Sequence, residues 1–407
     1  MKNIKRNEEY KVKEGDTVKQ DLLNCGYYRR GECNSCTEIE LRYPQQLAQK
    51  LEIAQKLIPA QEWLESAASV ISGFRNKVKL VVTGTFEEPN LGIIGQDLRN
   101  CPLPSSGIRE VLPIFADFIT RCQLRPYNFQ RNSGDLKYLI ITESPHGKLM
   151  LRFVVRRRGV QGIIRKYLPD LLNQLPELAV VSLNIQPERK AIIEGPEEII
   201  LTSGAELEIP LANLGFSLQL RPQSFFQTNT AQAEILYSQA AEWLKGASSA
   251  WDLYCGVGGF AFALAHAGIN EVVGVETSAE AVASAQINAQ HLQKLGLLLT
   301  SNDLDYALTP NLEFICADAR KWAQEQLNQR NIPEALVVNP PRRGIGKELA
   351  SWLNDSRITK IVYSSCNIDS MARDLELMPN YFVSQARVVD MFAHSAHFEC
   401  IALLQLK

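Results

Sequence analysis

Three apolar strands of this chain are each followed at once by residues suited to chemistry. The first, Ala250–Tyr254, leads into a glycine-rich turn, and the second, Ala335–Asn339, leads into a Pro-Pro-Arg sequence. The third ends shortly before Cys366. Because the carboxyl ends of parallel strands meet at one edge of a sheet, this arrangement predicts an α/β fold with its functional site along that edge.

The C-terminal half of the chain predicts a doubly wound parallel sheet, because strands and helical segments alternate along it. The parallel strands are predicted at Ala250–Tyr254, Glu271–Glu276, Leu312–Cys316, Ala335–Asn339 and Lys360–Tyr363. Two further strands, Phe382–Val389 and Phe398–Leu406, have no helix between them. We expect these two strands to form an antiparallel hairpin at the edge of the sheet, and we assign residues 206–407 to this Rossmann-like domain.

The N-terminal half predicts a different organisation. Residues 1–20 are polar and suggest a flexible lead-in, whereas residues 21–205 contain a cysteine cluster and an α+β region. A helix is expected over residues 43–71, and its apolar face is expected to pack on the C-terminal domain. The other predicted elements are strands at Lys77–Thr85, Leu91–Gly95, Tyr138–Thr142, Lys148–Arg156, Ala179–Ile185, Lys190–Glu194 and Ile199–Thr202, and a helix at Val160–Leu175. We interpret residues 293–311, which show little pattern, as a surface insertion.

Composition narrows the possible classes of protein. The chain has 407 residues, a net charge of −2 and 45% apolar residues, which is ordinary for a globular protein and argues against a broadly basic nucleic-acid binder. It has no apolar run long enough to span a bilayer and no apolar signal core at its N-terminus, so a cytoplasmic location is expected. Nine cysteines, an odd number, do not form a disulfide framework here; clustered cysteines in a reducing compartment bind metal or act in catalysis.

The glycine-rich turn predicts a nucleoside cofactor. Gly256 and Gly258 follow a strand and open a helix, which lets a ligand approach the backbone and the helix N-terminus. Glu276 ends the next strand, 18 residues past Gly258, where a carboxylate binds ribose hydroxyls, and Asp318 ends the following strand, where it can accept a bond from an adenine amino group. The spacing is not G-x-G-x-x-G, which favours S-adenosylmethionine over a nicotinamide. The alternative is a tight turn with surface carboxylates.

Cys366 is predicted to be a nucleophile. A thiolate that adds to C6 of a uracil turns C5 into an enolate carbon that accepts a methyl group, and a base must then remove the C5 proton. Glu399, on the last strand, can supply that base. The loop after Asn339 continues with Arg342 and Arg343 instead of the aromatic residue of exocyclic-amine methyltransferases, which favours contacts to phosphate or a base carbonyl.

The competing interpretation of a strand-end cysteine is buried apolar filler. It is the interpretation that we give to the remaining cysteines of the chain outside the N-terminal cluster, which are Cys122, Cys255, Cys316 and Cys400.

The N-terminal cysteines predict a metal centre. Cys25, Cys33 and Cys36 lie within 12 residues of one another, and Cys101, followed by Pro102, is a candidate fourth ligand. Four thiolates suit either zinc or a [4Fe–4S] cluster, and the Cys-Pro pair favours the iron–sulfur cluster.

A basic run over Arg152–Lys166 has two interpretations of equal weight. It contains six basic residues and no acidic residue, with Phe153 inside the run and Tyr167 next to it. Such a segment can follow an RNA backbone while the aromatic rings stack on bases, or it can be a solvated basic face.

Taken together, these motifs resemble the bacterial RNA uracil-C5 methyltransferases that carry an iron–sulfur cluster, over nearly the whole chain from about Asn24. The blocks that carry the resemblance are Gly73–Lys77, Asp97–Pro102, Leu136–Tyr138, Arg221–Asn229, the glycine turn, Asn339–Gly346 and Tyr363–Asn367. The resemblance implies a Rossmann-like S-adenosylmethionine-dependent methyltransferase domain with a separate α+β domain that binds RNA and the cluster.

The resemblance also implies individual roles. The [4Fe–4S] ligands would be Cys25, Cys33, Cys36 and Cys101. The contacts to S-adenosylmethionine would come from Gln227, Tyr254, Glu276 and Asn339. The nucleophile would be Cys366 and the base Glu399. Since methyl transfer needs no electron transfer, a structural role is expected for the cluster.

Two features indicate which RNA is methylated. Many relatives have Asp where this chain has Asn339, and an N-terminal OB-type barrel is not recognisable. Both features favour the branch of the family that methylates a uridine of 23S ribosomal RNA, with no obligate protein partner. The alternatives are the same chemistry on a transfer RNA or another ribosomal site, and a non-enzymatic iron–sulfur RNA-binding protein.

Overall fold

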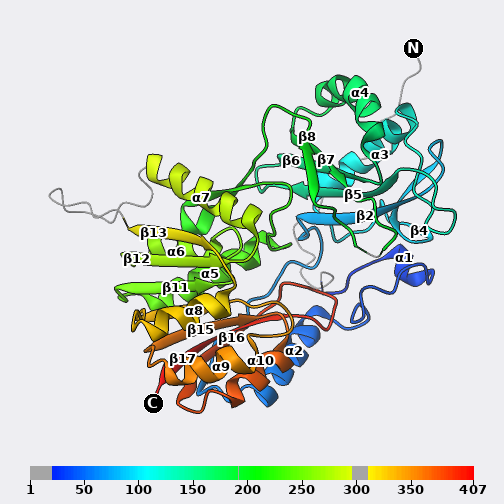
Figure 1. Ribbon diagram of the computed structural model, residues 1–407. Helices are drawn as coiled ribbons and strands as arrows, with labels where there is room; N and C mark the ends of the chain where they lie inside the picture. The colour runs from blue at the N-terminus through cyan, green and yellow to red at the C-terminus, as the bar shows by residue number, and fades with distance from the viewer. Residues whose placement is uncertain (1–20, 191, 296–309) are drawn as a thin grey trace.

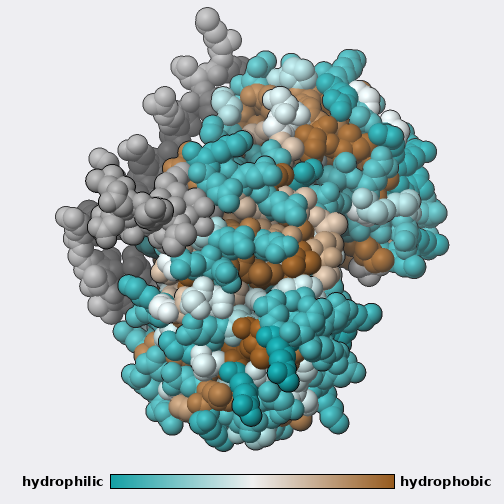
Figure 2. Space-filling model, turned by 60° about the vertical axis from the view of Figure 1, so that its left-hand side comes forward, coloured by the Kyte–Doolittle hydropathy of each residue, from teal (hydrophilic) through white to brown (hydrophobic). Residues whose placement is uncertain are grey.

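The computed structural model describes residues 21–190, 192–295 and 310–407. They form two large sheets, each with its own helices, that lie next to each other (Figure 1). On the face shown in Figure 2 most of the surface is hydrophilic, and one of the hydrophobic areas lies between the two lobes. The predicted lead-in at residues 1–20 and most of the predicted insertion at 293–311 lie outside the described residues. Within them, no helix is long and apolar enough to cross a membrane.

The C-terminal half folds into the predicted parallel sheet, which we call the catalytic sheet. Its strand order is β1-β16-β17-β15-β14-β11-β12-β13, and the five adjacent strands β11 to β15 run parallel. These five strands are β11 (Ser249–Leu253), β12 (Glu271–Glu276), β13 (Asn311–Cys316), β14 (Ala335–Val338) and β15 (Lys360–Ser365). The α/β prediction is therefore confirmed, with strand ends that differ from the predicted ones by at most two residues.

The last two strands form the predicted antiparallel hairpin, but not at the edge of the sheet. β17 (Glu399–Leu406) lies between β15 and β16 (Tyr381–Val389) and is antiparallel to both. The edge beyond β16 is covered by β1 (Glu62–Trp63), which comes from the N-terminal segment and pairs parallel with β16. The predicted edge position was wrong because the covering strand lies more than 300 residues away in sequence.

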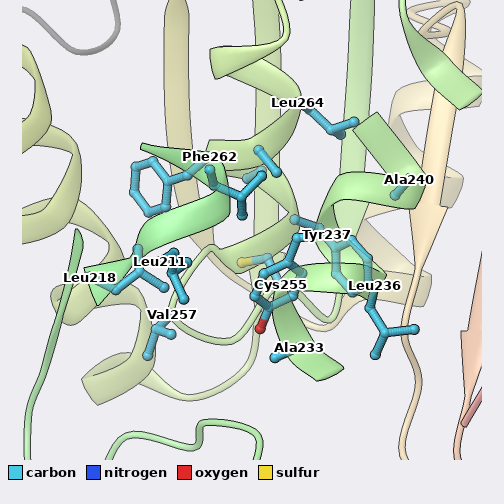
Figure 3. Close-up of a cluster of buried hydrophobic side chains, with 14 of the residues drawn as sticks. Leu211, Leu218, Ala233, Leu236, Tyr237, Ala240, Cys255, Val257, Phe262 and Leu264 are labelled. Carbon is cyan, nitrogen blue, oxygen red and sulfur yellow. The ribbon is translucent and has the colours of Figure 1, made fainter. Parts of the chain in front are cut away.

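Alternating residues of the catalytic sheet fill two apolar cores, one on each face. Ala250 and Val337 face one core, and their neighbours Trp251 and Val338 face the other. The first face is covered by α5 (Thr230–Leu244), α6 (Gly259–His266), α7 (Ala279–Lys294) and the hairpin of β9 (Leu207–Leu211) and β10 (Phe216–Leu220). The second face is covered by α2 (Tyr43–Leu57), α8 (Ala319–Asn328), α9 (Gly346–Asp355) and α10 (Ile368–Glu376). Figure 3 shows part of the first core, where Tyr237 of α5 lies beside Cys255 of the glycine turn.

Helix α2 belongs to the catalytic sheet although it precedes the central domain in sequence. The predicted helix over 43–71 ends at Leu57, because Pro59 disfavours a helical conformation for the residue before it. The helix packs against α10 and β16, as Figure 1 shows, and Ala54 and Ile58 are buried in the second core.

The central sheet holds most of the residues between 73 and 205. Its strand order is β4-β3-β2-β5-β6-β7-β8. The strands are β2 (Lys77–Gly84), β3 (Pro89–Ile93), β4 (Gln96–Asp97), β5 (Leu136–Glu143), β6 (Leu149–Val155), β7 (Leu178–Ile185) and β8 (Glu197–Ile200). The apolar sides of α3 (Ser106–Arg121) and α4 (Gln161–Gln174) cover one face, and α4 makes the crossover between the parallel strands β6 and β7.

The predicted strand at Lys190–Glu194 was wrong, since residues 190 and 192–194 pair with no strand. The Asn184 side chain instead bonds Gly195, its Oδ1 accepting from the Gly195 amide at 2.7 Å, and a Cβ at Gly195 would collide with the carbonyl of Ile185. The chain therefore crosses too close to β7 at Gly195 to pair with it as a regular strand.

Candidate active site

Cys366 lies directly after β15, half-buried, at the carboxyl edge of the catalytic sheet. The antiparallel register of β15 and β17 pairs Ser365 with Cys400, so the first residue of β17, Glu399, lies next to the cysteine. The structure thus brings together the predicted nucleophile and the predicted base, which are 33 residues apart in sequence.

Glu399 is buried and forms no ion pair with any residue that the structure describes. Glu399 is only 2% exposed, and its carboxylate accepts a hydrogen bond from Ser364 Oγ at 3.4 Å. Burial raises the pKa of Glu399 to about 8. Burial also raises the pKa of the Cys366 thiol; the nearby Glu399 carboxylate adds to this rise, and the Arg342 guanidinium opposes it.

Arg342 is held beside Cys366 by the loop that follows β14. Its carbonyl oxygen accepts a hydrogen bond from Asn367 Nδ2 at 2.7 Å, and its Nη2 lies 3.1 Å from His397 Nδ1. The Pro-Pro-Arg loop therefore faces the Cys366 turn on one side and the segment before Glu399 on the other. Asn339 begins this loop, and its amide bonds the carbonyl oxygen of Leu253 at the end of β11.

A buried carboxylate that sequence reasoning missed fixes the far end of the same loop. Asp374 of α10 accepts bonds from the amides of Ile345 at 2.8 Å and Gly346 at 3.3 Å and from Tyr363 Oη at 2.7 Å. A Cβ at Gly344, whose φ is +84°, would collide with the Asp374 carboxylate. The sequence contained one signal, an aspartate on the apolar side of an amphipathic helix.

The glycine turn has the tight geometry that a nucleoside cofactor needs. Tyr254, Gly256 and Gly258 have φ of +66°, +55° and +91°, and a Cβ at Gly258 would lie 2.6 Å from the Phe262 ring. Glu276 Oε2 accepts a bond from the Gly256 amide at 3.3 Å, so the predicted ribose-binding carboxylate lies beside the turn.

Asp318 serves as the N-cap of α8. Its Oδ1 accepts from the amides of Arg320 at 3.0 Å and Lys321 at 3.1 Å. It also lies near the glycine turn. Burial raises the pKa of Tyr254 to about 12, and the charges of Arg320 and Asp318 are close enough to affect this pKa. Asp318 thus lies at the expected place and already has a local role.

Two further buried polar groups adjoin the turn and were not singled out from the sequence. Asp252 is fully buried in β11; its Oδ2 accepts from the Ala261 amide at 2.9 Å, and its Oδ1 has no partner among the described residues. Burial raises its pKa to about 8. Tyr237 of α5 lies near both Asp252 and Glu399, and both carboxylates raise its pKa in addition to burial. In the sequence, Asp252 could have been noticed as an aspartate inside an apolar strand.

The segment that carries Gln227 joins the two sheets. Asn76 of the central domain donates from Nδ2 to the Gln227 carbonyl oxygen at 3.1 Å. On the other side, Ser224 Oγ lies 2.8 Å from Ser284 Oγ of α7, the helix that follows Glu276. Gln227 therefore lies at the junction between the central domain and the cofactor side of the catalytic sheet.

The four predicted cysteine ligands line one cavity of about 520 Å³ at this junction. Burial raises the pKa of the Cys36 thiol to about 11, and the nearby Cys101, Cys25 and Cys33 raise it further, whereas Arg75 opposes the rise. The cavity extends to Phe225 and to His397, which is two residues before Glu399. The structure thus brings the four N-terminal thiols together next to the active site.

The arrangement of these thiols differs from a single-ion site. In residues 21–190, 192–295 and 310–407, no three His, Cys, Asp or Glu side chains converge as the ligands of one metal ion. The thiols surround a space instead. In a [4Fe–4S] cluster each thiolate binds a different iron, so the ligands stand around a cluster and do not converge on one atom.

The other cysteines follow the expectation of apolar filler with one exception. Cys122, Cys255 and Cys400 are buried, but Cys316 is exposed at the end of β13. Its Sγ is directed to the carbonyl oxygen of Thr277 at 3.6 Å. The expectation was wrong for Cys316 because β13 is an edge strand, whose end is not covered.

The basic run does not form a continuous phosphate-binding track. Arg152 is buried and bonds Glu194 at 2.9 Å and Glu198 at 2.6 Å. Arg157 pairs with Asp135 at 2.7 Å, and Arg158 lies 3.5 Å from Glu197. Arg152 is not part of a solvated basic face either, because it is buried and neutralised by carboxylates. These carboxylates lie 42 to 46 residues later in the sequence.

Comparison with known proteins connects these features to a family. A family model described as tRNA (Uracil-5-)-methyltransferase matches residues 199–407. The chain is 41% identical over 395 residues to the 23S rRNA (uracil(747)-C(5))-methyltransferase of Serratia proteamaculans, covering 94% of this chain and 99% of that protein. It is 42% identical over 403 residues to the protein of the same description from Actinobacillus succinogenes, covering 95% and 100%.

A solved structure has the same overall fold. The tRNA (uracil-54, C5)-methyltransferase of Pyrococcus abyssi, in complex with S-adenosyl-L-homocysteine, superposes with a TM-score of 0.73 at 25% identity. The match covers 91% of this chain and 85% of the Pyrococcus chain, so it includes both sheets.

Proposed function

The chain belongs to the RNA uracil-C5 methyltransferases, and we propose that it transfers a methyl group from S-adenosylmethionine to C5 of one uridine in 23S ribosomal RNA. The target would be the uridine equivalent to position 747 in the substrate of its relatives. Near-complete coverage of both chains supports this choice, because it includes the central domain as well as the catalytic sheet. The observation that carries the chemistry is the juxtaposition of Cys366 with Glu399.

The first step belongs to Cys366. Its thiolate adds to C6 of the uracil, the C5=C6 double bond opens, and the electron pair moves onto the O4 enolate. Arg342 lies near enough to lower the pKa of the thiol and to compensate the negative charge that develops on the base. S-adenosylmethionine, when bound, supplies an electrophilic methyl group, which C5 accepts.

The second step belongs to Glu399. Its carboxylate takes the proton from C5, the double bond re-forms, and the bond between C6 and the Cys366 sulfur breaks to release the thiolate. Burial raises the pKa of Glu399 to about 8, so at pH 7 the protonated acid predominates and the ionised fraction is the form that takes the C5 proton. A base of this kind binds the abstracted proton more firmly than an exposed glutamate would.

The residues around the glycine turn fit S-adenosylmethionine. Glu276 is placed to bind the ribose hydroxyls, and Gly256 and Gly258 leave the start of α6 open to the ligand. Asp318 and Tyr254 would border the adenine. Gln227 and Asn339 would contact the cofactor near the reacting methyl group, at the junction where the target base enters.

We assign Cys25, Cys33, Cys36 and Cys101 as ligands of a [4Fe–4S] cluster. The support is the shared cavity and the neighbouring thiols that help raise the pKa of Cys36 and Cys101, since thiolates placed so close together need a cationic partner. The cluster would join the N-terminal segment to the loop before α3 and thereby shape the RNA side of the active site. It takes no part in the electron movements of methyl transfer.

The function is tested by methylating separate RNA species with the purified protein and a labelled methyl donor. We expect 5-methyluridine at a single position of a 23S ribosomal RNA transcript and none in a transfer RNA transcript. Methylation of transfer RNA alone would establish the same chemistry on the alternative substrate. Binding of both RNAs without any methyl transfer would instead indicate a non-enzymatic RNA-binding protein.

A further inference from the structure

One end of the central sheet gathers arginine side chains and exposed aromatic rings far from the catalytic residues. It consists of the loop over residues 125–135, Lys137 of β5, Arg156 and Arg157 after β6, and residues 186–190 after β7, and we call it the arginine edge. Among the described residues, three of the five contacts in which a cation lies over an aromatic ring occur here. No role in catalysis or cofactor binding accounts for this concentration.

The most exposed ring of this edge is Phe129. Its residue is 54% exposed, and the Arg189 guanidinium lies 5.1 Å from the ring centroid. The neighbouring Tyr127 ring is contacted by Lys137 at 4.7 Å and Arg156 at 6.0 Å. A large apolar ring beside a guanidinium is a platform on which an unpaired base can stack.

The charge of the arginine edge is strongly positive although the chain carries −2 overall. Its basic residues are Arg125, Arg131, Lys137, Arg156, Arg157, Arg189 and Lys190, and its acidic residues are Asp135 and Glu188. Asp135 is engaged by Arg157, and Glu188 by Lys190. Arg125, Arg131 and Arg189 form no ion pair within the described part of the chain and are exposed. Arg189 contacts the Phe129 ring, and Arg125 and Arg131 lie on the loop that carries it, so three guanidinium groups without an ion pair are available for the phosphates on either side of a stacked base.

The loop that carries Phe129 is ordered by its own hydrogen bonds. The amides of Tyr127 and Asn128 bond the carbonyl oxygens of Leu136 and Ser133, both at 2.7 Å. Arg156 and Arg189 each donate to a carbonyl oxygen of the loop, that of Asn132 at 3.0 Å and that of Gln130 at 3.3 Å. The ring is therefore presented in a fixed position, which lowers the entropy lost when a ligand binds.

The arginine edge and the active site lie at opposite ends of the same strands. β5 begins at Leu136 next to the Phe129 loop, whereas its other end pairs with Lys77, beside the Asn76 side chain that holds the Gln227 segment. β5 has eight residues, which corresponds to about 25 Å at roughly 3.3 Å per residue. A nucleotide at Phe129 would thus be several nucleotides away from the target uridine.

We propose that the arginine edge binds a single-stranded segment of the RNA substrate, with one unpaired base stacked on Phe129 and the flanking phosphates at Arg125, Arg131 and Arg189. The proposal rests on the proposed function in taking RNA as the ligand. It adds a second recognition site, which selects among RNAs that present a uridine to Cys366. An acidic protein segment would also be attracted by the charge, but it would not need the exposed ring.

The test compares Phe129→Leu, which keeps apolar volume without the ring, with Phe129→Trp, which keeps stacking. Binding is measured by fluorescence anisotropy with a long 23S fragment and with a minimal hairpin too short to span the distance. We expect Phe129→Leu to weaken binding of the long RNA by about tenfold, because loss of one stacked base removes about 1–3 kcal/mol. Phe129→Trp should bind like the wild type, and neither variant should change affinity for the hairpin or kcat at saturating RNA.

The charge contribution is tested with the double variant Arg125→Ala/Arg131→Ala. The slope of log affinity against log salt should become shallower by about one to two on the long RNA, because two phosphate contacts are lost. The matched control is Lys56→Ala/Lys245→Ala, two exposed cations on the catalytic lobe, which should leave the slope unchanged. Wild-type affinity and slope in the Phe129 and arginine variants, or an equal loss on the hairpin, would overturn the proposal.

Failure of the two proposals can be told apart. Binding is measured without methyl transfer. If the protein methylates no 23S fragment but Phe129→Leu still weakens its binding of single-stranded RNA, the proposal for the arginine edge stands and only the proposed substrate is wrong. If the protein methylates 23S RNA and all variants bind RNA with equal affinity, the proposed function stands and the proposal for the arginine edge is wrong.

Discussion

The central sheet and the catalytic sheet both bury charged side chains, but they surround them differently. In the central sheet, Arg152 is 1% exposed and is bonded by Glu194 and Glu198. In the catalytic sheet, Glu399 and Asp252 are buried and form no ion pair with any described residue, and burial raises the pKa of each to about 8. Removing one partner of a buried ion pair destabilises a fold strongly, whereas a buried carboxylate without a cation is destabilising in itself and is typical of a functional site.

The segment that leads to Glu399 uses the paired arrangement within the catalytic domain. Lys50 of α2 donates to Asp390 at 2.8 Å, and both side chains are almost completely buried. Asp390 also accepts from Tyr43 Oη at 2.8 Å, and Gln46 accepts from the His394 amide at 2.9 Å. These bonds fix the segment before Glu399, so that paired charges hold the unpaired catalytic carboxylate in place.

The largest expected effect is on activity, and it concerns the catalytic sheet. Cys366→Ala should lower methyl transfer by at least about a thousandfold, because no other group can add to C6. Binding of S-adenosylmethionine, measured by calorimetry, and the thermal midpoint should stay close to the wild type. Measurable turnover at the wild-type rate would show that Cys366 is not the nucleophile.

Glu399→Gln should stop the reaction after methyl transfer. The C5 proton remains in place, the thiol cannot leave, and a covalent protein–RNA adduct accumulates with turnover lower by about 10² to 10⁴. The measurement is a gel under denaturing conditions with labelled RNA. The control is Cys366→Ala/Glu399→Gln, which should give no adduct; an adduct in this double variant would place the bond on another residue.

Glu399→Gln should also stabilise the protein, and the gain should depend on pH. With a native pKa of about 8 against an ordinary value of 4.5, the native state of the wild type holds a proton that the unfolded state releases between these values. The free energy of unfolding of the wild type therefore falls as pH rises from about 4.5 to about 8. The glutamine variant lacks this loss, so its advantage should reach the order of a few kcal/mol near pH 8 and vanish near pH 4.

Urea unfolding of both proteins across this pH range measures the difference. A difference that does not change with pH would mean that the carboxylate titrates in the native state as it does in the unfolded chain, and that the contrast between the two sheets is incorrect.

Arg152→Met should lower the stability of the protein and leave its activity unchanged. It leaves Glu194 and Glu198 in a largely buried place without their cation, and we expect a loss of about 3 kcal/mol in unfolding free energy. Methyl transfer per folded molecule should be unchanged, since the pair lies outside the active site. The matched control Arg158→Ala removes an exposed pair and should change stability by less than about 1 kcal/mol. Equal effects of the two variants would remove the distinction between buried and exposed pairs.

Elements with a local signal were predictable from the sequence. The parallel strands β11 to β15 follow from their apolar runs, and the glycine turn follows from two residues that adopt positive φ. Cys366 and Glu399 could be predicted because the reaction requires a thiol and a carboxylate, and because both residues lie at the ends of predicted strands. By contrast, α3 was not predicted, because Pro113 interrupts its pattern, and its helical form depends on packing against the central sheet.

The sequence by itself determined the α/β order, the cofactor turn and the residues suited to nucleophile, base and metal ligands, since each depends on spacing within a short segment. Only the tertiary structure decided which charges are paired. Lys50 meets Asp390 across 340 residues, β1 covers the edge that the C-terminal hairpin was expected to form, and the basic run is neutralised by carboxylates from later segments. The physical reason is that burial and pairing depend on neighbours that the chain brings together only when it folds.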